Sequence, residues 1–194
     1  MCNLSQASDI ILVAGGIGIT PILSLLRQLC HIYTIRSSSG SSTTHSLPPL
    51  PPVTVVWSLR QSFLLSVFCE QLSEVLRSHF SLSLITIKVY FTAKYVDLPE
   101  ISPEMKSVIQ SGARPDLNGI FSTVKDRSLR RDIKPSAVHA IACGPEPLTL
   151  SVQKHWYVST TLPPVIFSGH SFLVFPIPSS LENGFTFFSE DFYF

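Results

Sequence analysis

The sequence predicts an α/β domain in which helices flank an open parallel sheet. Segments of strand length and apolar or alternating character occur at residues 9–14, 53–57, 84–92 and 138–142. Other stretches, such as residues 20–29 and 63–80, repeat apolar residues at helical spacing. Strands that are apolar on both faces and alternate with helices are typical of a parallel sheet covered on both sides.

The first strand and the first helix are joined by a glycine-rich turn. Residues 9–29 read DIILVAGGIGITPILSLLRQL: an apolar strand, a turn, and a helix with Thr20 as N-cap and Pro21 in its first position. Glycines permit positive φ and close approach of a ligand, and the N–H groups at a helix start attract anions. We therefore predict a phosphate-binding turn. The alternative is a turn whose glycines only let strand and helix pack. The turn comprises Gly15, Gly16, Ile17, Gly18 and Ile19.

This pattern differs from two common phosphate loops. Pro21 stands where the third glycine of G-x-G-x-x-G would follow Gly16 and Gly18. No lysine follows the glycines, as a triphosphate-binding loop would require. The turn therefore indicates a ligand of the diphosphate type.

The second strand ends near two polar residues of interest. Residues 53–57 are followed by Ser58 and Arg60. A hydroxyl and a guanidinium at the carboxyl end of a strand suit a ribose 2′-phosphate, because guanidinium can bind phosphate through two parallel hydrogen bonds. This favours NADPH over NADH. The alternative for Arg60 is a solvated surface charge.

The remaining elements follow from the same periodicities. Residues 31–52, rich in Ser, Thr and Pro, are predicted to be a disordered insertion. Ser102 is expected to cap the helix that begins at Pro103. The predicted helices after the insertion are residues 63–80, 103–111, 121–132 and 146–157.

The totals of the chain exclude several kinds of function. Its 194 residues carry 14 basic and 13 acidic side chains, which gives no electrostatic basis for binding nucleic acid or an anionic membrane. Charged residues are only 14% of the chain, and the mean hydropathy is +0.32, so we expect a face covered by a partner or a further domain. The four cysteines are spread without metal-ligand spacing, and no metal site is predicted.

A second glycine turn, ACGPEPL, follows the strand at 138–142. Together, AGGIGITP and ACGPEPL resemble the C-terminal NAD(P)-binding domain of the ferredoxin-NADP reductase superfamily, in its ferric-chelate reductase and NADPH oxidase branch. The segments VVWSLRQ at 55–61 and GARPDLNGIF at 112–121 support the resemblance. It implies a Rossmann-like parallel sheet and NADPH or NADH as cofactor.

The resemblance also implies roles for individual residues. Cys143 would pack beside the nicotinamide and orient its hydride-bearing carbon toward flavin, which makes it the candidate catalytic residue. No Cys/His/Asn signature supports a hydrolase nucleophile at this position. Arg114, where the family has Gly-Arg-Pro, is a second candidate contact for phosphate or ribose, and Phe194 would pack against the flavin ring. The candidate cofactor-binding residues are Gly15, Gly16, Ile17, Gly18, Thr20, Pro21, Ser58, Arg60, Arg114, Cys143, Gly144, Pro145 and Phe194.

We predict one NAD(P)H-binding domain over residues 1–157. Residues 158–180 are interpreted as an irregular apolar insertion, of the kind an unspliced exon would add. Prolines interrupt the segment, and its apolar part is shorter than the ~20 residues of a membrane-spanning helix. Residues 181–194 are expected to form the terminal aromatic strand of the same domain.

The predicted function is that of the NAD(P)H-binding module of a membrane flavocytochrome-type oxidoreductase. Hydride would pass to FAD, and electrons onward to ferric iron or oxygen. The first strand begins within ten residues of Met1, so we expect the FAD-binding and haem-bearing membrane domains to be missing here or on another chain. The chain alone is expected to be soluble and cytoplasmic, and its parent protein to hold it at the cytosolic face of a membrane. The alternative is a truncated, catalytically silent nucleotide-binding fragment or regulatory module.

Overall fold

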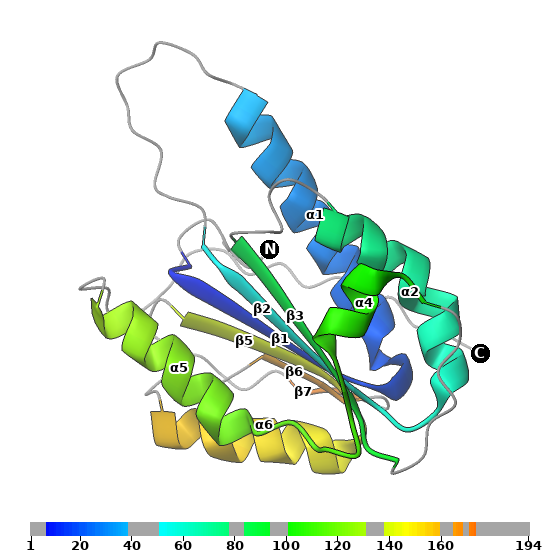
Figure 1. Cartoon of the computed structure of the whole chain (residues 1–194). Coiled ribbons are helices and arrows are strands. Elements are labelled where there is room, and N and C mark those ends of the chain that lie inside the picture. The colour runs from blue at the N-terminus through cyan, green and yellow to red at the C-terminus, as the bar shows by residue number, and fades with distance from the viewer. Residues whose placement is uncertain are drawn as a thin grey trace.

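The computed structural model contains one α/β domain built around a twisted sheet (Figure 1). It describes residues 7–38, 51–77, 84–93, 101–130, 138–159, 165–168 and 171–173. Among these residues, no helix is long and apolar enough to cross a bilayer.

The described sheet has seven strands in the order β4-β3-β2-β1-β5-β6-β7. All neighbouring pairs are parallel except β6 and β7, which confirms the predicted open parallel sheet. The strands are β1 (Asp9–Gly15), β2 (Val53–Leu59), β3 (Ile85–Phe91), β4 (Ile109–Ser111), β5 (Val138–Gly144), β6 (Val165–Ser168) and β7 (Ser171–Leu173).

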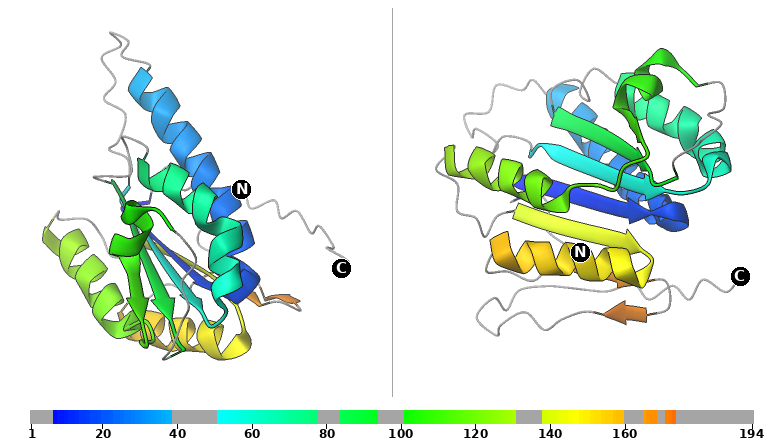
Figure 2. Two further views of the ribbon diagram at one scale, coloured as in Figure 1. Left: turned by 45° about the vertical axis from the view of Figure 1, so that its right-hand side comes forward. Right: turned by 60° about the horizontal axis from the view of Figure 1, so that its bottom comes forward.

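Helices cover both faces of this sheet. On one face lie α1 (Ile19–Ser38), α2 (Ser62–Arg77) and α4 (Pro103–Val108), and on the other lie α5 (Leu117–Arg130) and α6 (Glu146–Ser159). Figure 2 shows this three-layer arrangement from two further directions. Because the sheet lies between two layers of helices, the domain has a core on each face.

Strand β1 contributes to both of these cores. Ile10 and Leu12 belong to the core shared with α1 and α2, whereas Ile11 and Val13 belong to the core shared with α5 and α6. None of the four side chains is exposed to solvent. Side chains of a strand alternate between the two faces of a sheet, so a strand covered on both faces needs the continuous apolar run that residues 10–13 provide.

The first helix differs from the prediction at both ends. A short 3₁₀ helix, η2 (Gly16–Gly18), leads directly into α1, so Thr20 and Pro21 lie inside the first turn of α1. The Thr20 hydroxyl donates to the Ile17 carbonyl at 3.0 Å, so the prediction that Thr20 is an N-cap is wrong. Pro21 is still tolerated, because N–H groups of a first turn have no partner within the helix.

The predicted disorder of residues 31–52 is wrong for residues 31–38, which continue α1. Tyr33 is buried, and its hydroxyl donates to the Pro51 carbonyl at 2.6 Å. This contact joins the C-terminal half of α1 to the residues just before β2, and the sequence pattern did not indicate it. Residues 39–50 lie outside the described residues.

Several other boundaries differ from the expected ones. The helix at Pro103 ends at Val108, and Ile109–Ser111 form β4 instead of continuing it. Ser102 caps that helix as predicted, since its side chain accepts a hydrogen bond from the Met105 N–H. Helix α2 is described over Ser62–Arg77, and residues 78–80 of the predicted range lie outside the described residues. Val67 in this helix, expected on its buried side, is 57% exposed. Helix α5 begins at Leu117, four residues before the expected start.

The prediction that residues 158–180 form an irregular insertion is wrong for residues 165–168 and 171–173, which form β6 and β7. Strand β6 lies within this range and pairs in parallel with β5, with Ile141 opposite Val165. The insertion was expected to start at residue 158, but α6 continues to Ser159. The predicted terminal strand at 181–194 lies outside the described residues.

Candidate functional site

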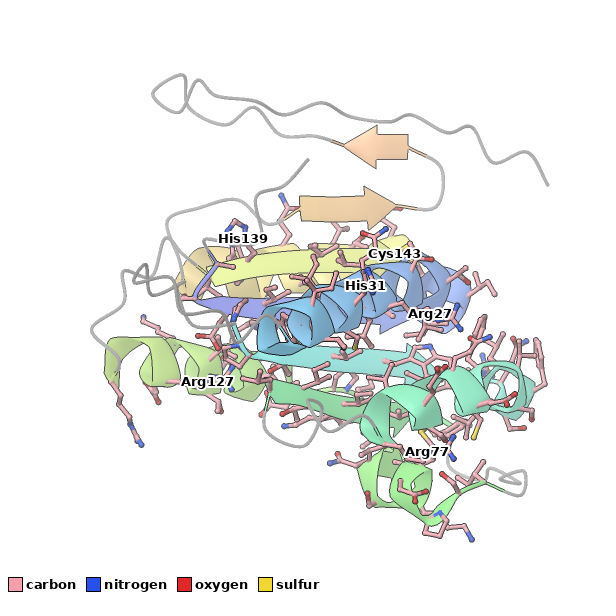
Figure 3. All side chains as sticks on the ribbon, turned by 90° about the horizontal axis from the view of Figure 1, so that it is seen from above. Arg27, His31, Arg77, Arg127, His139 and Cys143 are labelled. Atoms are coloured by element: carbon pink, nitrogen blue, oxygen red, sulfur yellow. The ribbon has the colours of Figure 1, made fainter. Side chains whose placement is uncertain are left out.

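The carboxyl ends of β1, β2 and β5 bring most of the predicted site residues to one edge of the sheet. Gly15 lies opposite Ser58 in the pairing of β1 with β2, and Ala14 lies opposite Cys143 in the pairing with β5. Figure 3 shows Cys143 at one end of the sheet and His139 and Arg127 toward the other.

This edge contains the point at which the order of the strands reverses. From β1 the chain proceeds to β2, β3 and β4 on one side, then returns to place β5 on the other side of β1. In open α/β sheets, ligands bind outside the carboxyl ends of the strands at such a reversal. Both glycine turns stand there, one after β1 and one after β5.

The two glycine turns are in direct contact. A Cβ placed on Gly18 would collide with the Cys143 carbonyl oxygen, and one on Gly144 would lie 2.8 Å from the Gly15 Cα. A Cβ on Gly15 would lie 2.6 Å from Cδ of Pro145. Gly15, Gly18 and Gly144 must therefore be glycines for the two turns to pack against each other. For Gly15 and Gly18, this is the packing role that the alternative interpretation of the first turn proposed.

Gly16 is required for a different reason. Its φ is +55°, which favours glycine, and the nearest atom to a Cβ placed there would be Cδ1 of Leu64 at 4.0 Å. Next to it, Ile17 is 65% exposed, and Thr20 and Pro21 are also exposed. The outer side of the turn is therefore open, and it carries N–H groups of a helix start that lack partners within the helix. These groups suit the phosphates of a dinucleotide.

Trp57 contacts the same turn from inside the protein. Its side chain is buried, and the indole N–H donates to the Gly16 carbonyl at 2.9 Å. The ring also makes an edge-to-face contact with Phe68 of α2, with centroids 6.1 Å apart. Sequence reasoning did not single out Trp57; the available signal was an indole N–H, which needs a partner when buried, within an apolar strand.

The predicted contacts for the adenosine end lie along the same edge. Ser58 is half-buried at the end of β2, and Arg60 follows that strand with an exposed side chain. Arg114 is exposed in the loop that leads from β4 to α5, and the adjacent Ala113 N–H donates to the Phe91 carbonyl at 3.1 Å. Strand β3 separates β2 from β4, so Arg114 lies further from the glycine turns along this edge than Arg60 does.

Cys143 occupies the last but one position of β5 and is half-buried. Burial raises the pKa of its thiol above the ordinary value. The side chain is therefore protonated at neutral pH, which argues against a thiolate nucleophile. Gly144 is half-buried and Pro145 exposed beside it, and Phe194 lies outside the described residues.

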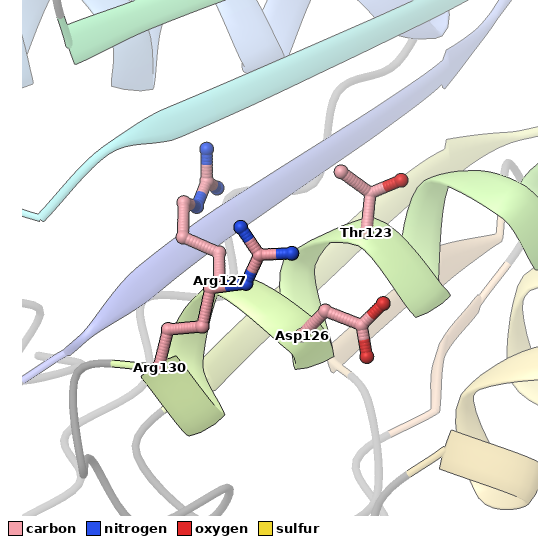
Figure 4. Close-up of a pocket in the computed structure, with 4 residues that line it drawn as sticks. All are labelled: Thr123, Asp126, Arg127 and Arg130. Carbon is pink, nitrogen blue, oxygen red and sulfur yellow. The ribbon is translucent and has the colours of Figure 1, made fainter.

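A separate pocket lies at the opposite end of the sheet. It has a volume of about 400 Å³ and is lined by Thr123, Asp126, Arg127 and Arg130 of α5 (Figure 4). Arg127 forms an ion pair with the buried Asp9 at the start of β1. None of the predicted site residues lines this pocket. In the described part of the chain, no group of three or more His, Cys, Asp and Glu residues is placed to hold a metal ion.

Comparison with known proteins gives a family match. The family model described as "Ferric reductase NAD binding domain" matches residues 7–111, more than half of the chain. No curated protein sequence gives a significant match.

The fold also occurs in solved structures of other proteins. The CS-b5R domains of human Ncb5or, in an NAD⁺ form, superpose with a TM-score of 0.52 at 17% identity over 85% of this chain. Flavohemoglobin from Malassezia yamatoensis, with bound FAD and heme, gives 0.50 at 17% identity over 84% of this chain. The aligned region covers only 37% and 31% of those two chains, so this protein spans about a third of their length.

Proposed function

Because this chain belongs to the ferric reductase NAD-binding domain family, we propose that it binds NADPH at the carboxyl edge of the sheet and presents the nicotinamide to a flavin. The family is the one that the two glycine motifs predicted. The observation that carries the proposal is the direct contact between those two turns at the point of strand reversal. One turn suits the pyrophosphate, and the other adjoins it where the nicotinamide would lie.

The backbone of the first turn would hold the pyrophosphate. Gly16, Ile17 and Gly18 carry N–H groups at the start of a helical stretch, where the helix dipole also favours negative charge. The Thr20 hydroxyl donates to the Ile17 carbonyl. It would have to rotate away from that carbonyl to donate to a phosphate oxygen. Pro21 has no N–H group to donate to a phosphate, and it would only fix the backbone of the first turn of α1.

The adenosine end would extend over the end of β2. Ser58 and Arg60 lie there on either side of Leu59, and an arginine suits the 2′-phosphate that distinguishes NADPH from NADH. Arg114, further along the edge, would make a second contact with phosphate or ribose. The preference for NADPH is therefore assigned mainly to Arg60.

The nicotinamide end would lie over Cys143, Gly144 and Pro145. When bound, NADPH would supply the hydride, and a flavin would accept it. Hydride transfer needs no acid or base from the protein, so the residues here would contribute alignment and shielding from water. A protonated, half-buried thiol at Cys143 is consistent with packing against an uncharged part of the ring.

FAD would come from another domain, with Phe194 against its ring. The human neighbour was solved in an NAD⁺ form and the Malassezia neighbour with FAD and heme, in chains between two and three times as long, which supports such an arrangement. We propose a membrane-bound parent protein with FAD- and haem-binding domains, in which electrons pass to ferric iron or oxygen and this domain faces the cytosol.

Calorimetric titration with NADPH and NADH tests the proposal. The folded chain should bind NADPH more tightly than NADH, and Arg60→Ala should weaken NADPH binding about tenfold or more, because a charge-assisted contact is lost. Arg130→Ala, an exposed arginine at the opposite end of the sheet, is the matched control and should leave the affinity unchanged.

Absence of binding by the folded wild-type chain would contradict the proposal. Binding without reduction of an added flavin domain would instead support the alternative of a catalytically silent nucleotide-binding module.

A further inference from the structure

The chain has two tryptophans in closely similar surroundings. Trp57 is not exposed at all and Trp156 is 2% exposed. Each ring packs edge-to-face on a phenylalanine, Trp57 on Phe68 and Trp156 on Phe121, with centroids 6.1 and 5.7 Å apart. They differ in location, because Trp57 touches the glycine turn after β1, whereas Trp156 lies in α6 within the core of the other face.

We infer that Trp57 is a positioning residue for the nucleotide, because it fixes the orientation of the peptide group between Gly16 and Ile17. In a planar trans peptide, the carbonyl and the N–H point in opposite directions. The Gly16 carbonyl accepts the indole N–H of the buried Trp57 at 2.9 Å. The Ile17 N–H of the same peptide group therefore points away from the core, toward the open side of the turn.

The orientation of this peptide group depends on the hydrogen bonds that its carbonyl accepts. Gly16 has φ +55° and no Cβ, so its ψ, one of the two torsions that turn this peptide group, is less restricted than in other residues. The second donor to the Gly16 carbonyl is the Ile19 N–H, which is shared with the Ile17 carbonyl. Without the indole, the Gly16 carbonyl would keep only this shared donor, and the Ile17 N–H would be held less firmly in the direction of a bound phosphate.

The inference rests on the proposed function and is tested by Trp57→Phe, which keeps a buried ring and removes the N–H. NADPH should bind to this variant about three- to tenfold more weakly, as expected for the loss of one hydrogen bond. Trp156→Phe, the same change at an equally buried site, should bind NADPH like the wild type. Circular dichroism confirms that both variants are folded.

A second ligand separates positioning from a general structural effect. Adenosine 2′-monophosphate carries the 2′-phosphate but has no pyrophosphate, so Trp57→Phe should bind it as the wild type does. An equal loss for both ligands, an equal loss in both tryptophan variants, or no loss of NADPH affinity would overturn the inference.

A measurement without ligand keeps the inference testable even if the wild type binds no nucleotide and the proposed function fails. Nitrogen-15 relaxation dispersion detects exchange on the μs–ms timescale. It should show exchange at the Gly16 and Ile17 amides in Trp57→Phe, and none there in the wild type or Trp156→Phe. Identical dispersion profiles in all three proteins would rule out the assigned role.

Discussion

At the scale of single residues, the glycines of the two turns serve different physical purposes. Gly18 and Gly144 have no room for a side chain, because the backbone of the other turn occupies that space. Gly16 has room but a positive φ, and Gly112, after β4, combines φ +72° with open space. Substituting alanine should therefore have different effects at these positions.

Gly18→Ala should lower the free energy of unfolding by about 2–3 kcal/mol, because its Cβ would displace backbone of the second turn. The matched change Gly112→Ala meets no neighbouring atom and should cost only the strain of a left-handed conformation, about 1 kcal/mol. Urea denaturation of both variants measures the difference. Equal losses would mean that the two turns are not packed as described.

Cys143 should react slowly with iodoacetamide at neutral pH. Burial raises its thiol pKa, so at pH 7 the reactive thiolate fraction is smaller than that of an ordinary cysteine. The labelling rate should still increase above about pH 9, and bound NADPH should reduce it further. Mass spectrometry of the peptide containing Cys143 separates it from the other cysteines. A rate that levels off below pH 8 would reveal an activated thiolate and contradict this assignment.

At the scale of elements, an ion pair ties β1 to α5 at the end of the sheet opposite the site. Asp9 is completely buried, and its partner Arg127 is 31% exposed. A buried pair of this kind adds little over an apolar contact, but removing Arg127 takes one opposite charge away from the buried Asp9 carboxylate. The pair should therefore matter for stability and not for nucleotide binding.

Arg127→Ala should lower the free energy of unfolding by about 3 kcal/mol. Arg130→Ala, one turn further along α5 and exposed, should change it by less than about 0.5 kcal/mol. Chemical denaturation measures both values, and the NADPH affinity of the folded Arg127→Ala protein should equal that of the wild type. A similar small effect of both substitutions would show that the ion pair contributes nothing to stability.

The elements also show which features a single sequence can predict. Strands β1, β2, β3 and β5 were predicted because an apolar or alternating run is a local signal. Residues 31–38 were not predicted as helix, because only Tyr33 among residues 31–35 is buried, and its partner Pro51 lies across the insertion. Residues 109–111 and 165–168 are short strands that depend on pairing with neighbours, which periodicity does not reveal.

At the scale of the whole molecule, the topology assembles a site from segments far apart in sequence. The glycine turns were predicted as binding elements from local pattern and family resemblance, and the sheet order places them side by side. The hydrogen bond from Trp57 to Gly16 joins residues 41 positions apart, so no local pattern predicted it. The position of Arg114 beyond β3 likewise depends on the order of the strands.

NADPH should bind at the carboxyl edge of the sheet, where the two glycine turns meet. An NMR titration of the nitrogen-15-labelled chain with NADPH tests it most directly, because it reports every amide at once. The largest shifts should fall on Gly16–Gly18, Ser58, Arg60 and Gly144, whereas Thr123–Arg130 at the opposite end should remain unchanged. Shifts concentrated on Thr123–Arg130, or no shifts in a folded protein, would contradict nucleotide binding at the glycine turns.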